Sequence, residues 1–120
     1  MGTSRKPSLI RIVNLEQGMP LVHEALTNLD RELALARQQR CPLVKLIHGY
    51  GSSGSGGDIR IAVQKRLREL QEQATVRAYI FGEDWSSSDA QTWALLKSQP
   101  ALKTDSDLGK RNLGITIVVL

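Results

Sequence analysis

One histidine and the glycine-rich segment after it carry the residue types best suited to chemistry in this 120-residue chain. His48 is followed by Gly49–Gly57, which holds five glycines and three serines in nine positions. Such a turn between a strand and a helix lets backbone N–H groups and the positive end of the helix dipole approach an anion. We therefore expect a phosphate site formed by Gly49, Tyr50, Gly51, Ser52, Ser53 and Gly54.

His48 at the start of this turn has two interpretations. An imidazole titrates near neutral pH, so a histidine beside a bound phosphate is a candidate general acid or base. The alternative is a histidine whose hydrogen bonds only order the turn. Arg60, within one helical turn of the loop, is expected to add a guanidinium to phosphate binding. Lys110 and Arg111 are candidates for the same basic surface.

Two nucleotide motifs match this loop in part. Gly49, Gly51 and Gly54 fit the dinucleotide pattern G-x-G-x-x-G, but the acidic residue expected about 20 positions later has only the distant Glu83 as a candidate. A Walker A loop needs a lysine where Ser55 stands. A small nucleotide- or phosphate-binding enzyme that uses this loop therefore stays open as one alternative function.

The elements that position the loop follow from hydrophobic periodicity and from turn residues. The apolar pattern predicts helices over residues 20–39 and 58–73, and strands over residues 9–15, 43–48, 75–81 and 115–120. Helical crossovers make the first three strands parallel. The expected fold class is α/β, an α+β two-layer sandwich with a four-stranded mixed sheet. Both main helices should cover one face.

An insertion at about residues 83–113 separates the third and fourth strands, and it is too long for a bare loop. Ser88 and Gln91 predict a capping box that starts a short helix ending near Ser98. Trp85 and Trp93 are expected to be buried as the anchors of this insertion, with base stacking as the alternative. We expect a single domain over residues 9–120, preceded by a flexible arm over residues 1–8.

Composition narrows the partners and the compartment. The net charge is +4, yet residues 83–107 hold five acidic side chains against two lysines, so the positive charge lies elsewhere and favours a phosphate partner. No apolar run approaches the roughly 20 residues of a membrane span. Cys41 is the single cysteine, which favours a reducing cytoplasm. Two histidines, including His23 on a polar helix face, make a zinc site improbable, whereas magnesium held partly by substrate phosphates is compatible with the sequence.

Three motifs in order resemble the Smr (small MutS-related) domain family. Leu46-Ile-His48-Gly-Tyr-Gly51 looks like its H-G-x-G signature, the helix Ile59–Leu70 follows, and Gly114-Ile-Thr-Ile-Val-Val-Leu120 looks like its G-x-T-x-V-x-L closing strand. The resemblance implies a fold similar to the C-terminal domain of a bacterial translation initiation factor, with the last strand antiparallel to its neighbour. It also implies nucleic-acid binding, DNA more than RNA, and structure-selective DNA nicking or RNA cleavage.

The first strand departs from that family pattern. Smr domains usually carry L-D-L-H-G there, but this chain reads Val13-Asn-Leu-Glu-Gln-Gly18, so Asn14 or Glu16 stands near the acidic position and the histidine is missing. Two further functions therefore stay open: an endonuclease in which His48 transfers a proton, and a non-catalytic nucleic-acid-binding or interaction module.

Overall fold

A computed structural model describes residues 9–51 and 56–120 of the chain. The flexible arm predicted for residues 1–8 lies outside this part. In chain order the elements are β1 (Ile10–Asn14), α1 (Val22–Gln38), β2 (Leu43–Ile47), α2 (Gly56–Glu72), β3 (Ala78–Phe81), the 3-10 helix η1 (Gly82–Asp84), α3 (Ala90–Ser98), the 3-10 helix η2 (Pro100–Thr104) and β4 (Ile115–Val119).

The four strands form one mixed sheet in the order β1-β2-β4-β3. β1 pairs parallel with β2, while β4 lies between β2 and β3 and is antiparallel to both. The three strands joined by helical crossovers therefore run in the same direction, as right-handed β-α-β connections require. The predicted mixed sheet with an antiparallel last strand is confirmed.

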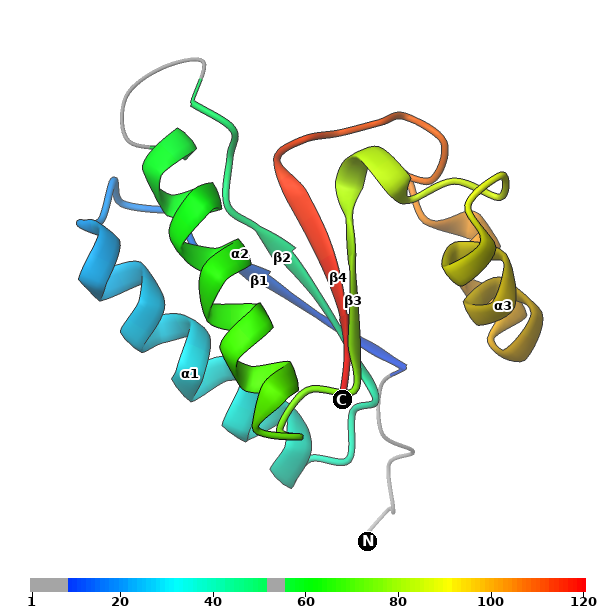
Figure 1. The fold of residues 1–120 in the computed structure, drawn as a ribbon, viewed down its shortest axis with the longest axis horizontal. Helices are drawn as coiled ribbons and strands as arrows, with labels where there is room; N and C mark the ends of the chain where they lie inside the picture. Colours follow the sequence, from blue (N-terminus) through cyan, green and yellow to red (C-terminus); the bar gives the residue numbers. More distant parts are fainter. Residues whose placement is uncertain (1–8, 52–55) are drawn as a thin grey trace, which may run out of the picture.

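α1 and α2 lie side by side on one face of the sheet (Figure 1). Their apolar stripes recur with helical spacing, so one side of each helix is buried against that face. Alternation along the strands supplies the other half of this core, whose members include Ala25, Leu29, Leu33, Val44, Leu46, Ile59, Val63, Leu67 and Val118.

The insertion covers the opposite face of the sheet and adds a partial third layer (Figure 1). Its core is centred on Trp85, which is fully buried among side chains of β2, β3, β4, α3 and η2. Trp85 is thus an anchor, as predicted. The same prediction for Trp93 is wrong, because its side chain is 54% exposed on α3.

Two predicted helix starts are also displaced. α1 begins at Val22 and not at Pro20, because the carboxylate of Glu24 accepts the N–H of Leu21 at 2.8 Å and fixes the first turn there. α3 is capped by Asp89, which accepts the N–H of Thr92 at 2.9 Å, and not by Ser88. Among the described residues, no helix has the length and apolar character needed to cross a membrane.

Candidate nucleic-acid interface

His48 follows the last residue of β2 and is fully buried. Its position continues the alternation of Val44 and Leu46, so its ring lies on the side of the sheet that α1 and α2 cover. Nε2 lies 2.9 Å from the hydroxyl of Thr116 on β4, and Nδ1 lies 2.8 Å from the carbonyl oxygen of Gly49. Both ring nitrogens therefore have a partner within the protein.

The surroundings of His48 keep its imidazole neutral. Burial lowers its pKa below the ordinary value of 6.5 and outweighs the hydrogen bond that the ring donates to the Gly49 carbonyl. The Arg60 guanidinium lowers the pKa further, while the Glu83 carboxylate raises it. Because a carbonyl oxygen only accepts, Nδ1 of the neutral ring donates to Gly49 and Nε2 accepts the Thr116 hydroxyl proton. The ring joins the end of β2 to β4.

The loop after His48 is held close to the start of β4. The N–H groups of His48 and Gly49 both donate to the carbonyl oxygen of Gly114, at 2.9 and 3.1 Å. Gly49 was expected to offer its amide to a phosphate, but that amide is already bonded. Ser52, Ser53 and Gly54 lie outside the described residues.

Gly51 marks the place where the loop approaches α2. Its φ is +94°, and a Cβ on Gly51 would lie 2.9 Å from Cα of Gly57 in the first turn of that helix. Any side chain here would force the two backbones apart. Tyr50 lies between Gly49 and Gly51 in the sequence, and its side chain is 54% exposed. The loop therefore presents one aromatic ring beside Gly114, at the start of β4.

Arg60 forms an ion pair with a carboxylate that sequence analysis did not predict as its partner. Its Nη2 lies 2.8 Å from Oε2 of Glu83, in η1 after β3. Within the described part of the chain, Arg60 Nε and Glu83 Oε1 are buried without a hydrogen-bond partner. The pair joins the N-terminal part of α2 to η1, and an incoming anion would compete with Glu83 for the guanidinium.

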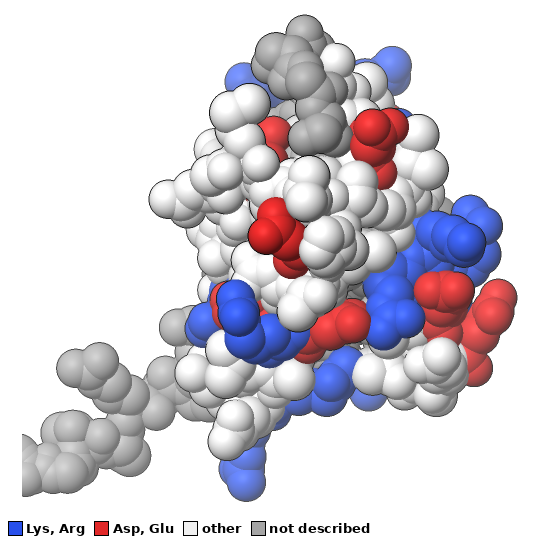
Figure 2. Space-filling model, turned by 90° about the vertical axis from the view of Figure 1, so that its left-hand side faces the viewer, with Lys and Arg blue, Asp and Glu red and all other residues white. Residues whose placement is uncertain are grey.

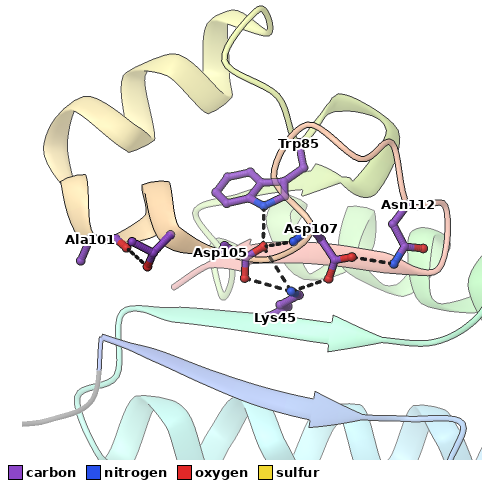
Figure 3. Close-up of polar contacts among 7 residues, drawn as sticks. Lys45, Trp85, Ala101, Asp105, Asp107 and Asn112 are labelled. Carbon is purple, nitrogen blue, oxygen red and sulfur yellow. Dashed lines mark hydrogen bonds and ion pairs between the residues drawn. The ribbon is translucent and has the colours of Figure 1, made fainter.

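A second buried network holds the turn before β4 (Figure 3). Lys45 is buried on β2, and its ammonium group donates to Asp105 at 2.9 Å and forms an ion pair with Asp107. Trp85 Nε1 donates to Asp105 at 3.0 Å, and Asn112 donates to Asp107 at 2.9 Å. Sequence inspection did not anticipate this network, because a lysine at an inward strand position has no local signal for a distant partner.

The charges of this network reinforce one another. Burial opposes protonation of Lys45, but hydrogen bonds to Asp107 and Asp105 outweigh it and raise the lysine pKa. Hydrogen bonds from Lys45 and then Asn112 lower the pKa of Asp107. Asn112 also accepts the N–H of Gly114 at 2.8 Å. Polar contacts therefore run from the insertion to Gly114, the residue that receives the His48 and Gly49 amides.

The first-strand position that departs from the Smr pattern has a local role. The Asn14 side-chain oxygen accepts the N–H groups of Glu16 and Gln17, both at 3.0 Å, and forms the turn that ends β1. Asn14 and Glu16 are both exposed. No group of three or more His, Cys, Asp or Glu side chains able to hold a metal ion occurs among residues 9–51 and 56–120.

Basic side chains are distributed unevenly over the face of the molecule that α1 and α2 form. Figure 2 shows Lys and Arg gathered on its lower half, intermixed with Asp and Glu, below a mostly uncharged upper half. Among the basic residues of α2, Arg66 is paired with Asp30 at 2.8 Å and with Glu69 at 3.6 Å. The turn before β4 carries two further exposed cations, Lys110 and Arg111, at the same end of the sheet as the glycine loop (Figure 1).

The fold and the H-G-x-G loop define an Smr-type α/β domain. The family model of the Smr domain matches residues 17–97, and the chain belongs to this family. Among solved structures, the chain is similar to the Smr domain of Thermus thermophilus MutS2, with 24% identity and a TM-score of 0.57. That likeness covers 92% of this chain and 96% of the other, and it shows the shared fold. No curated protein matches the sequence significantly.

Proposed function

We propose that this Smr domain binds nucleic acid at the end of the sheet where β2 ends and β4 begins. The observation that carries the proposal is the H-G-x-G loop, fixed against β4 by His48 and against α2 by the contact of Gly51 with Gly57. A loop held this closely presents its backbone and Tyr50 without further ordering on binding, which lowers the entropic cost of association.

The charges at this end of the sheet suit a phosphate backbone once Arg60 is released from Glu83. Arg60, Lys110 and Arg111 supply the cations, and the half-exposed Tyr50 ring supplies a stacking surface. The preference for DNA over RNA in this proposal comes from the resemblance to the Smr family.

His48 acts in this proposal as a positioning residue. A neutral, fully buried ring with both nitrogens bonded has no free position for a substrate proton. Proton transfer by His48, and hence endonuclease activity, would require the loop to open away from Gly114. We therefore favour a binding module over a DNA-nicking or RNA-cleaving enzyme.

The experiment is a fluorescence anisotropy titration of labelled single-stranded, duplex and branched DNA, and of the matching RNAs, at increasing salt. Affinity should fall steeply with salt, because each phosphate contact releases counterion. Arg60→Ala should weaken binding for all sequences alike, whereas the matched control Arg68→Ala, further along α2, should not. Absence of binding to every substrate at low salt would reject the proposal. Nicking of a supercoiled plasmid that His48→Ala abolishes would restore the enzyme interpretation.

A further inference from the structure

The insertion is acidic by composition, yet the structure directs most of its acidic groups inward. Asp105 and Asp107 bind Lys45, Glu83 binds Arg60, and Asp89 caps α3 through Thr92. These contacts neutralise or occupy four of the five carboxylates between residues 83 and 107, leaving Asp84 exposed on η1. The outward charge of α3 and η2 is therefore set by their lysines.

Those lysines flank the exposed tryptophan of α3. Lys97, one helical turn after Trp93, places its ammonium nitrogen 4.9 Å from the centroid of the indole ring. Lys103 on η2 lines the same hollow, of about 340 Å³, together with Trp93 and Ser87. Residues 90–104 contain these two lysines and no Asp or Glu.

The Trp93 indole is 54% exposed, so a large part of its ring is open to a partner. α3 is short, and its inward side chains Thr92 and Leu96 already join it to the body of the domain. Trp93 is thus not required to anchor the insertion. Lys97 lies over the indole ring and would move to a phosphate as a base takes its place on the ring. An exposed aromatic ring with two lysines beside it then matches a nucleobase with its neighbouring phosphates, because bases of every kind stack on aromatic rings.

We infer that Trp93, Lys97 and Lys103 form a second nucleic-acid contact, in which an unpaired base stacks on Trp93 while the lysines bind the adjoining phosphates. This inference rests on the proposed function and names single-stranded nucleic acid as the form recognised at this contact. The contact lies on the insertion, on the opposite face of the sheet from α1 and α2 (Figure 1). Bases within a duplex are stacked and paired, so only single-stranded or splayed segments can use it.

The test is titration of the full chain with unlabelled oligodeoxythymidylate, read by tryptophan fluorescence. Stacking should quench Trp93, whereas Trp85 is buried and hydrogen-bonded. Trp93→Ala should weaken binding on the order of tenfold, the usual effect of losing one aromatic–base stack. Trp93→Phe should retain most of the affinity but lose the quenching. Lys103→Ala should weaken binding and reduce its salt dependence, whereas Lys65→Ala on α2 serves as the matched control.

The outcomes separate this inference from the proposed function. If the wild type binds and Trp93→Ala binds equally well, the Trp93 contact is rejected and the loop interface stands. If Trp93→Ala weakens binding to inorganic polyphosphate as much as to the oligonucleotide, stacking on a base is rejected. If the wild type binds no oligonucleotide, both ideas fail together. Because Trp93 is exposed, each variant should melt within a few degrees of the wild type, which thermal denaturation checks.

Discussion

The imidazole Nε2 of His48 lies 2.9 Å from the hydroxyl of Thr116, and both side chains are fully buried. The bond joins the end of β2 to the antiparallel strand β4, whose start also receives the two backbone amides of the loop. The histidine of the H-G-x-G motif is thus a buried residue that connects two strands of the sheet.

Removing the His48 ring should therefore cost stability. His48→Ala leaves the Thr116 hydroxyl buried and without its partner, which should lower the free energy of unfolding by about 1–3 kcal/mol. Chemical denaturation measures the loss, and His23→Ala on the exposed side of α1 is the matched control. A His48→Ala protein as stable as the wild type would show that the bond to Thr116 contributes little.

The same burial predicts a pH dependence. Because the folded-state pKa of His48 is lowered, the unfolded chain binds the proton more tightly, and stability falls as pH drops through the ordinary value of 6.5. Above that value the contribution is fully present. Denaturation at about pH 7.5 and about pH 5.5 should show the decline, and His48→Gln should reduce it while His23→Gln leaves it in place. An equal decline in both variants would assign the effect to other groups.

Lys45 should be the most sensitive charged position in the described structure. Lys45→Met leaves Asp105 and Asp107 without their shared cation, which should destabilise the fold by about 3 kcal/mol. Lys103→Met, at an exposed position on η2, should change stability by less than about 0.5 kcal/mol. Comparable melting temperatures for the two variants would mean that the network of Figure 3 does not hold the insertion in solution.

Glu83 restrains Arg60, so its neutralisation should favour nucleic acid. Glu83→Gln weakens the pair with Arg60 and removes a negative charge from the binding edge, and affinity should rise on the order of threefold to tenfold at low salt. Glu72→Gln changes the net charge equally at the far end of α2. Equal gains in both variants would indicate a general charge effect and no specific release of Arg60.

Most of the fold was predictable because periodicity reports local burial. The alternation of β2 and β4 and the helical stripes of α1 and α2 carry strong signals, and these elements were predicted from them. The antiparallel direction of β4 was predicted from the resemblance to the Smr family. The start of α1 was not predictable from Pro20, because the cap depends on where the Glu24 side chain turns. Trp93 was misplaced since an apolar residue on a short helix does not indicate which side is buried.

The site was predictable in position and less so in its contacts. His48, Gly51 and Arg60 lie near one another as the strand–loop–helix pattern required, yet their partners are Thr116, Gly57 and Glu83, residues distant in the chain or on a neighbouring element. Such pairings depend on tertiary geometry, which no local pattern encodes. The inward Lys45 network depended on the same information.

The central claim is that nucleic acid binds at the end of the sheet that carries the H-G-x-G loop. Backbone amide chemical shifts, followed by NMR while single-stranded or branched DNA is added, test this location residue by residue. The largest shifts should fall on Tyr50, Gly51, Gly57, Arg60 and Gly114, with a separate set around Trp93 and Lys97 for single strands. Shifts confined to the C-terminal halves of α1 and α2, around Arg37, Arg66 and Arg68, would contradict it.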